Sequence, residues 1–406
     1  MTRIAQGKQV WLVAGLLLAL LALSTIGIHN VTRENNLGID QIIFWHAGRA
    51  VFLESASPYT EEVAQLSQLS VYKRLAAPNE DQLAFVYPPF TLLVLLPTYW
   101  MDYSWAQALW LAFNLLVFAS VFPLFYPQHR RWVPLSALLL YPLTFGLITG
   151  NFAVLITSCL LILFALILQE QPLSVGSQVV IGMMLAWITF KPQFVWLILA
   201  FYLLASLRQR RIWLLVSFAT GVMMLVLISF WMVPNWLTEW LARIDQYTQY
   251  NHSLPILTLF LQRILPQRIA SLLTGATLAL ALAATAWLFR RWWQGKQSAL
   301  SVTAWCGLVV YTFHPHGASY EQLTFMFPML IWAATAQQSN RRFSGWLWVG
   351  MLVASWVIFA IAKSHQPPPL ATEWLLFPAA AWVIWLVTRE LKKPESLSGI
   401  MGQPSP

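Results

Sequence analysis

The sequence predicts an all-helical integral membrane protein. Of its 406 residues, 58% are hydrophobic and only 10% are charged. A soluble domain carries about 25% charged residues, so this composition excludes an ordinary soluble enzyme. Long apolar stretches recur from Val10 to Thr388, and many of the 23 Trp fit aromatic belts at the two membrane interfaces. We therefore expect one polytopic membrane domain over residues 1–390, followed by a short cytoplasmic tail at 391–406.

The apolar runs predict about twelve membrane crossings, since a spanning helix needs about 17–25 apolar residues. They are residues 10–28, 104–126, 133–149, 151–168, 176–190, 192–206, 212–233, 267–289, 298–313, 322–336, 344–362 and 372–388. The first lacks a small-residue cleavage site, so we expect a retained membrane helix rather than a signal peptide. The run at 88–96 is too short to span and lies between prolines, which indicates a re-entrant or interfacial helix.

The basic residues predict the orientation of these crossings. With twelve crossings and a cytoplasmic N-terminus, 15 of the 24 basic residues and three of the 15 acidic residues fall on the cytoplasmic side. This agrees with the excess of Lys and Arg in cytoplasmic loops. A full crossing at 88–96 would place the basic clusters at 208–211 and 290–296 outside. The net charge of +9 is thus a topology signal, because its short clusters form no stripe that could follow a nucleic-acid backbone.

Polar motifs gather on the predicted outer side. The first outer loop, residues 29–103, is the longest and carries Asp40, His46, Arg49, Tyr59 and Tyr87-Pro88-Pro89. Further outer turns carry Gly150-Asn151, Lys191-Pro192, Asn251-His252-Ser253, Arg263, His314-Pro315-His316 and Tyr320-Glu321. Ionisable residues near helix ends are costly in lipid and usually line a cavity or pair with one another. We therefore expect a water-facing site at the outer leaflet.

The segment Asp40–Glu54 is expected to form a helix that packs on two sides, because its apolar residues are not confined to one stripe. Asp40 in its first turn would face the positive end of the helix, which favours an ionised carboxylate. The alternative is that Asp40 only caps the helix.

In their order along the chain, these motifs resemble those of glycosyltransferase family 87. The resemblance covers roughly residues 36–330. It rests on Asp40 with Phe44-Trp45-His46-Ala47, Ser57-Pro58-Tyr59, Phe85-Val86-Tyr87-Pro88-Pro89-Phe90, Gly150-Asn151, Lys191-Pro192, Asn251-His252-Ser253 with Arg263, and His314-Pro315-His316 before Tyr320-Glu321. This chain has Ser55 where the family often has Gly, and Gly150-Asn151 where it often has Gly-Gln. Such departures leave the sugar and the acceptor open.

The resemblance implies a GT-C-type bundle and transfer of a sugar, mannose in the family, from a polyprenyl phosphate. The expected acceptor is a hydroxyl of a lipid or glycan at the outer membrane face, and the reaction inverts the anomeric carbon. By resemblance, Asp40 is the catalytic general base, and Lys191, Arg263 and His316 bind the donor phosphate. The expected substrate-binding residues are His46, Arg49, Tyr59, Tyr87, Asn151, Asn251, His252, Tyr320 and Glu321.

Neither a cofactor nor a metal is expected. The chain has no Asp-x-Asp pair, and Pro315 restricts the geometry of a zinc site at His314, His316 and Glu321. Cys159 and Cys306 lie in apolar runs and are expected to be small buried hydrophobes.

Several alternatives stay open at this level. Lys191 could instead be a snorkelling interface anchor, and Arg263 could pair with Glu239 or Asp245. The main alternative function is a polytopic transporter or flippase of a lipid-linked sugar, although the two halves of the chain show no evident repeat. Another lipid-linked glycan enzyme, such as a polymerase or ligase, would have its largest loop later. The expected location is a bacterial plasma membrane, with membrane lipids, donor and acceptor as partners.

Overall fold

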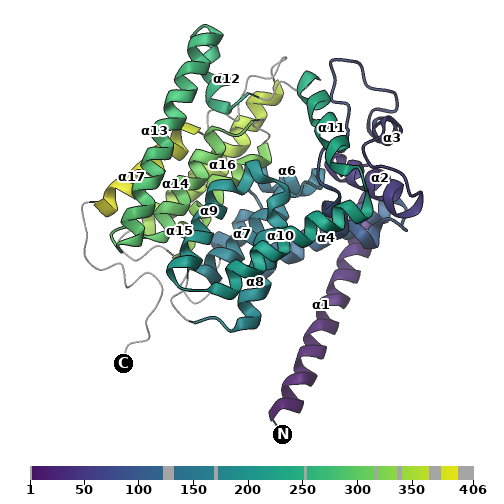
Figure 1. The fold of residues 1–406 in the computed structure, drawn as a ribbon, viewed down its shortest axis with the longest axis horizontal. Helices are drawn as coiled ribbons and strands as arrows, with labels where there is room; N and C mark the ends of the chain where they lie inside the picture. Colours follow the sequence, from purple (N-terminus) through teal and green to yellow (C-terminus); the bar gives the residue numbers. More distant parts are fainter. Residues whose placement is uncertain are drawn as a thin grey trace. The chain divides into compact units, whose positions relative to one another are not determined.

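The computed structural model describes residues 2–121, 132–168, 172–250, 254–315, 319–335, 341–364 and 376–391. These residues are arranged mainly as helices, and an antiparallel bridge joins Pro255 to Pro315 (Figure 1). The chain forms two compact units. One consists of Met1–Ser120, Leu147–Phe152 and Val226–Asn251, and the other of Val121–Gly146, Ala153–Leu225 and His252–Pro406.

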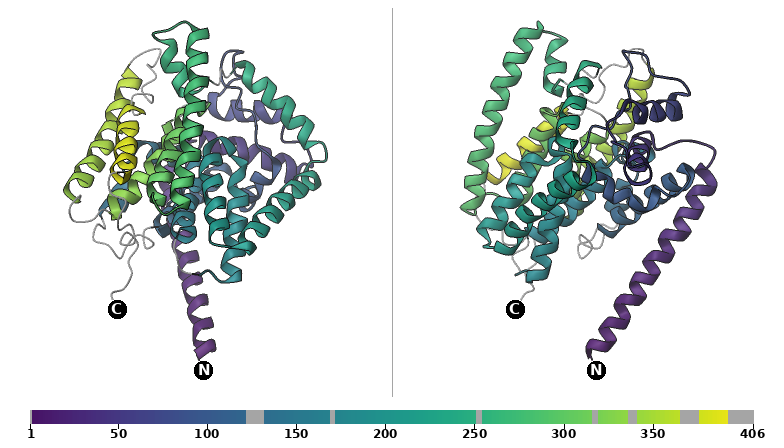
Figure 2. Two further views of the ribbon diagram at one scale, coloured as in Figure 1. Left: turned by 60° about the vertical axis from the view of Figure 1, so that its left-hand side comes forward. Right: turned by 45° about the vertical axis from the view of Figure 1, so that its right-hand side comes forward.

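The first unit is built on the N-terminal third of the chain. Its helices are α1 (Thr2–Thr32), α2 (Ile39–Leu53), α3 (Glu61–Tyr72), the 3₁₀ helix η1 (Pro89–Thr98), α4 (Tyr103–Val121) and α11 (Trp236–Tyr250). α2 contacts both α3 and η1. α1 extends away from the rest of this unit as one long helix (Figures 1 and 2).

The helix predicted at 40–54 is confirmed as α2. Its buried residues include Ile42, Phe44, Ala47 and Ala50, which lie around most of the helix circumference. Packing on two sides is therefore confirmed as well. It follows that α2 is a fixed element, which can hold a side chain of its first turn in a defined place.

The short helix predicted at 88–96 is confirmed as η1, a ten-residue 3₁₀ helix. The buried ring of Tyr99 lies against α2 at Gly48, where an added Cβ would overlap the ring. The Tyr99 hydroxyl donates a hydrogen bond of 2.6 Å to the carbonyl of Leu92. These contacts fasten η1 to α2, while its position at a membrane interface stays a prediction.

The second unit has a core of closely packed apolar helices. α14 (Ala299–Thr312) contacts α9 (Pro192–Arg208), α13 (Gln267–Trp293), α15 (Leu323–Thr335) and α17 (Leu376–Leu391), and α7 (Ala153–Ile167) contacts α9 and α15. The further helices are α5 (Trp132–Ala137), α6 (Tyr141–Thr149), α8 (Val175–Trp187), η3 (Ile188–Phe190), α10 (Ile212–Met232), α12 (Ile256–Gln262), η4 (Ser319–Gln322) and α16 (Arg341–Ser364). Of these, α6 and α10 run from one unit into the other. Cys159 and Cys306 are buried, as predicted.

Five helical segments of the described chain are long and apolar enough to cross a membrane. They are Leu12–Thr32, Tyr103–Val121, Ile212–Met232, Gln267–Trp293 and Arg342–Ile361. Other apolar helices are shorter; α7 has 15 residues, and a helix of this length rises about 22 Å against a hydrocarbon core of about 30 Å. The protein is thus an integral membrane protein, while the number of twelve crossings stays a prediction.

The predicted crossing at 133–149 is not one continuous helix, and its passage through the membrane stays a prediction. α5 ends at Ala137 and α6 begins at Tyr141, so the chain makes two short helices there. Pro142 cannot continue a helix from α5, because its ring would meet the carbonyl of the residue four positions earlier. α16 satisfies the backbone groups freed at the break: Trp356 Nε1 donates to the Leu139 carbonyl at 2.7 Å, and Ser355 Oγ accepts from the Tyr141 amide at 3.3 Å.

Two arginines of the predicted cytoplasmic clusters bind the carbonyl ends of helices in the second unit. Arg211 Nη1 donates to the carbonyls of Leu166, at 3.1 Å, and Ile167, at 2.8 Å, at the end of α7. Arg208 Nη1 donates to the carbonyl of Trp292 at 3.0 Å, at the end of α13. Cations stabilise the negative ends of helices, so these residues have a structural role beyond topology.

Candidate active site

Asp40 is the second residue of α2 and is partly exposed. Gly38 occupies the position that caps this helix, so the interpretation of Asp40 as only a helix cap does not fit. The first turn of a helix presents backbone N–H groups and a positive dipole end, both of which stabilise a carboxylate. The local structure therefore favours the ionised form of Asp40.

The turn at Gly150-Asn151 holds the Asp40 carboxylate. Asn151 Nδ2 donates a hydrogen bond of 2.9 Å to Asp40 Oδ2. Gly150 has a φ of +69°, and a Cβ added to it would lie 2.7 Å from the Cβ of Gln41. The Gly150 carbonyl accepts a hydrogen bond of 2.8 Å from Trp110 Nε1. Backbone conformation and close approach thus both require glycine directly before the residue that binds Asp40.

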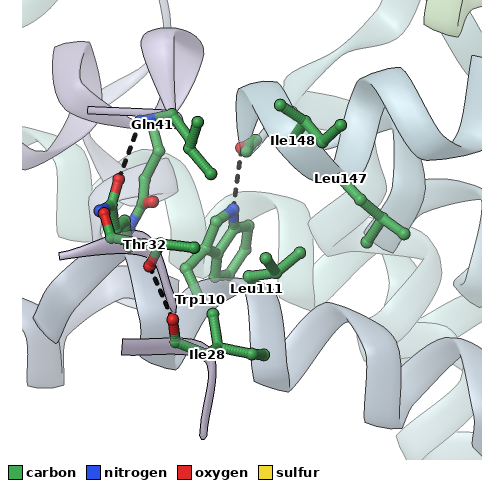
Figure 3. A pocket seen from close by; sticks show the side chains of 11 residues that line it. Ile28, Thr32, Gln41, Trp110, Leu111, Leu147 and Ile148 are labelled. Carbon is green, nitrogen blue, oxygen red and sulfur yellow. Dashed lines mark hydrogen bonds between the residues drawn. The ribbon is translucent and has the colours of Figure 1, made fainter. Parts of the chain in front are cut away.

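Behind this turn the protein is packed. Figure 3 shows Trp110 between Thr32 and Gln41 on one side and Leu147 and Ile148 on the other. The cavity that these residues line measures about 10 Å³, which is room for about one water molecule. A substrate therefore has to approach Asp40 from another side.

An aromatic cluster lies one helical turn beyond the carboxylate. The ring centroid of Phe44 is 4.6 Å from that of Phe152 and 4.9 Å from that of Tyr87. The hydroxyl of Tyr59 donates a hydrogen bond of 2.7 Å to the Tyr87 carbonyl. Burial, and to a lesser extent the charge of Glu239, raises the pKa of Tyr59, so the phenol keeps its proton for this bond. Tyr59 and Tyr87, both predicted site residues, are thus brought together.

α11 contributes contacts to this region that sequence reasoning missed. Arg243 Nε donates to the Tyr59 carbonyl at 3.1 Å, and Arg243 Nη1 lies 3.3 Å from Glu61 Oε2. Trp240 Nε1 donates to the Val86 carbonyl at 2.9 Å. α11 therefore fixes both segments of the first loop that carry the tyrosines.

A sequence signal for α11 was present. Large side chains recur every three or four residues from 236 to 250, a spacing that predicts one face of an amphipathic helix. They are Trp236, Trp240, Arg243, Tyr247 and Tyr250.

His46 and Arg49 make contacts that anchor α2. His46 Nε2 lies 2.9 Å from the hydroxyl of Ser70 in α3. Burial, together with the nearby positive charge of Arg49, lowers the pKa of His46 to about 4, so the imidazole is neutral at neutral pH. Arg49 Nη1 donates to the Tyr99 carbonyl at 2.7 Å, and its guanidinium lies 4.8 Å from the ring centroid of Trp45.

The second unit contains a buried charge cluster. Lys191, between η3 and α9, has its Nζ atom 2.7 Å from Glu321 Oε1, and both side chains are about 4% exposed. His314 Nε2 lies 3.2 Å from Glu321 Oε2. The Lys191 ammonium is 5.1 Å from the ring centroid of Tyr320. Lys191 is thus enclosed in protein, which does not fit a snorkelling anchor with its ammonium in water.

The remaining predicted residues are less informative. Arg263 is exposed and follows α12. Asn251, His252 and His316 lie outside the described residues. Among the described residues, no group of three or more His, Cys, Asp and Glu side chains is arranged to hold a metal ion.

A match to a protein-family model identifies the class of enzyme. The model described as glycosyltransferase family 87 matches residues 85–315, which is more than half of the chain. The chain belongs to glycosyltransferase family 87. The family resemblance predicted from the motifs is thereby confirmed, and the protein is a glycosyltransferase rather than a transporter. Neither curated proteins nor solved structures give a significant match to the chain.

The family match includes some of the predicted site residues of this glycosyltransferase and not others. Tyr87, Asn151, Lys191 and Arg263 fall within the matched residues, and Asp40 precedes them. Asn151 connects the matched segment with Asp40, because it lies within the matched residues and donates a hydrogen bond to the Asp40 carboxylate.

Proposed function

We propose that this glycosyltransferase moves mannose from a polyprenyl phosphate to a hydroxyl of a lipid or glycan acceptor, with inversion at the anomeric carbon. The proposed location is a bacterial plasma membrane, with the site on the extracytoplasmic side. The observation that carries the proposal is the Asp40 carboxylate, which lies at the positive end of α2 and is held by Asn151.

Asp40 is the proposed general base. The acceptor oxygen attacks the anomeric carbon, the bond from that carbon to the phosphate oxygen breaks, and the hydroxyl proton passes to Asp40. An ionised carboxylate in a fixed orientation suits this task, since a general base has to be within hydrogen-bond reach of the proton that it takes. Asn151 supports it by donating to one carboxylate oxygen while its backbone is fixed by the Gly150 turn.

The leaving polyprenyl phosphate gains negative charge as the bond breaks. Lys191, Arg263 and His316 are the proposed groups that bind it, and guanidinium and ammonium groups are suited to phosphate oxygens. Lys191 is paired with Glu321, so the donor phosphate would share or replace this counter-ion. The other proposed substrate-binding residues are His46, Arg49, Tyr59, Tyr87, Asn151, Asn251, His252, Tyr320 and Glu321.

The test is transfer of radiolabelled mannose from polyprenyl-phosphate-mannose by membranes that contain wild type or Asp40→Asn. We expect the variant to lose about 10²–10⁴-fold in rate at normal protein level, which is the usual contribution of a general base. Asp245→Asn is the matched control, because Asp245 is an exposed carboxylate on α11 and should leave the rate unchanged.

Two results would contradict the proposal. Undiminished transfer by Asp40→Asn would remove Asp40 from the mechanism. A wild type that transfers no mannose but uses another polyprenyl-phosphate sugar would overturn the choice of mannose while keeping the enzyme class.

A further inference from the structure

Four basic side chains of the second unit lie where α9 and α13 end. Arg208 is the last residue of α9, Arg290 and Arg291 lie in the last turn of α13, and Lys296 follows shortly after it. Arg208 Nη1 donates to the Trp292 carbonyl at 3.0 Å, which fastens the end of α9 to the end of α13. We call Arg208, Arg290, Arg291 and Lys296 the α13 basic cluster.

The turn after α13 holds two members of this cluster next to each other. The Gly295 amide donates to the Trp292 carbonyl at 2.9 Å, and the Lys296 amide donates to the carbonyl of Arg291 at 2.9 Å. Gly295 has a φ of +73°, so these two bonds form a Schellman motif with a left-handed glycine. Arg291 Nη2 in turn donates to the Lys296 carbonyl at 3.3 Å. The chain thus folds Lys296 back toward the end of α13, beside Arg291.

The cluster has hydrogen-bond donors that the protein does not use. Arg291 Nε is buried and has no hydrogen-bond partner in the described part of the chain. No member of the cluster forms an ion pair with a described residue. A buried N–H of a charged group is costly without an acceptor, so we expect an acceptor from outside the chain.

The acids of the second unit do not neutralise the cluster. Among its described residues these acids are Glu321 and Glu390. Glu321 is paired with Lys191. Glu390 accepts hydrogen bonds of 2.6 to 2.9 Å from residues 297–301, directly after the cluster. Even with Glu390 counted, four cations stand against one carboxylate, so the region favours an anionic ligand.

Large apolar side chains around the cluster are exposed. Leu207 is 52%, Trp287 46% and Trp293 43% exposed. Gln267–Trp293 is long and apolar enough to span the membrane, and only 17% of its apolar segment is buried. The Arg291 guanidinium lies 5.1 Å from the ring centroid of Trp287. Tryptophan and basic residues at the end of a spanning helix are typical of the membrane interface, so the cluster lies at the depth of lipid headgroups.

The cluster is far from the residues proposed to bind the donor phosphate. Lys191 directly precedes α9 and Arg208 ends it, so about 25 Å of helix separates them. Arg263 precedes α13, and Arg290 lies about 35 Å along this helix from Gln267. These lengths are close to the hydrocarbon thickness of about 30 Å. A phosphate bound at the cluster is therefore a second one, at the opposite ends of α9 and α13.

We propose that the α13 basic cluster binds the headgroup phosphate of an anionic phospholipid, whose acyl chains lie along the exposed apolar surface of α13. Phosphate oxygens accept several hydrogen bonds at once, and a guanidinium group binds them as a fork. Four cations would repel the ammonium of a zwitterionic headgroup and attract an anionic one such as phosphatidylglycerol. The inference does not depend on the reaction proposed above.

Native mass spectrometry of the purified full-length protein in detergent tests the proposal by measuring the affinity for added lipids. We expect phosphatidylglycerol to bind about tenfold more tightly than phosphatidylcholine with the same acyl chains. Lys296→Gln and Arg291→Gln should each weaken the binding of phosphatidylglycerol about tenfold, the loss expected from one charged hydrogen bond. The binding of phosphatidylcholine should change little.

Two further variants separate a built site from general attraction by charge. Arg342→Gln is the matched control, because Arg342 is an exposed basic residue at the start of α16 and its loss changes the net charge equally. It should bind phosphatidylglycerol as the wild type does. Arg291→Lys keeps the charge but loses the fork and the Nε donor, so it should bind more weakly than the wild type.

Four outcomes would overturn the proposal. Equal losses in Arg342→Gln and Arg291→Gln, or wild-type affinity in Arg291→Lys, would mean that net charge alone attracts the lipid. Displacement of phosphatidylglycerol by an equal concentration of glycerol 3-phosphate would make the cluster a site for soluble phosphates. Preferential binding of polyprenyl phosphate would make it a site for the donor lipid. Lipid binding requires neither sugar transfer nor Asp40, so Asp40→Asn should bind phosphatidylglycerol as the wild type does.

Discussion

The two clusters of predicted site residues hold their charges in opposite ways. Asp40, in the first unit, is partly exposed, and a neutral amide and a helix end support its carboxylate. Lys191, in the second unit, is buried and neutralised by Glu321 at 2.7 Å. A partly exposed charge supported by dipoles can meet a substrate without losing its partner. When one partner of a buried ion pair is lost, the other charge is left unpaired unless an incoming charge takes the place of the lost partner.

The largest stability effect is expected from breaking the buried pair. Lys191→Met leaves Glu321 buried with its counter-ion removed and should cost about 3–5 kcal/mol, whereas the double variant Lys191→Met/Glu321→Met should be close to wild type in stability. The thermal unfolding midpoint in detergent measures both. If Lys191 binds phosphate, the stable double variant transfers sugar poorly. Recovery of full activity along with stability would show that the pair is only structural.

A smaller effect is expected from removing the amide that supports Asp40. Asn151→Leu keeps the number of side-chain heavy atoms and their branch point and removes a hydrogen bond to a carboxylate, a bond worth about 1.5–3 kcal/mol. We expect the rate to fall about tenfold to a hundredfold with little change in the donor KM. The parallel variant Asn114→Leu, in α4, is the control, since it removes a buried amide without a contact to Asp40. A rate unchanged from wild type would mean that Asn151 does not position the base.

The smallest effect concerns the neutral histidine that anchors α2. The folded pKa of His46 is about 4 against an ordinary 6.5, so between these values the unfolded chain binds a proton that the folded chain does not. The stabilisation is fully present above pH 6.5 and is lost as the pH falls through 4. Lowering the pH from 6.5 to 5.5 should cost about 1 kcal/mol.

Thermal unfolding of wild type and His46→Gln across this pH range measures the effect. The wild type should lose stability more steeply than the variant as the pH falls. Parallel curves would show that folding does not lower the pKa of His46.

Local patterns were sufficient for most of the elements. The apolar runs predicted the membrane class, the helix at 40–54 and the short helix at 88–96, because hydropathy and proline placement act over a few residues. The order of short motifs also predicted the family. Helix α11 was missed because its amphipathic spacing mixes Trp, Arg and Tyr. The apolar run at 133–149 predicts one element by hydropathy, and Pro142 is the local sign that the helix is interrupted there.

The membrane class, the positions of most of the apolar helices and the family were thus determined by the sequence itself. Only the tertiary structure decided which side chains meet. Asn151 reaches Asp40 across 111 positions of the chain, and Lys191 reaches Glu321 across 130. Such pairs have no periodicity or spacing to mark them. They form because packed helices bring distant turns together, and because a buried charge or polar group has to find a partner there.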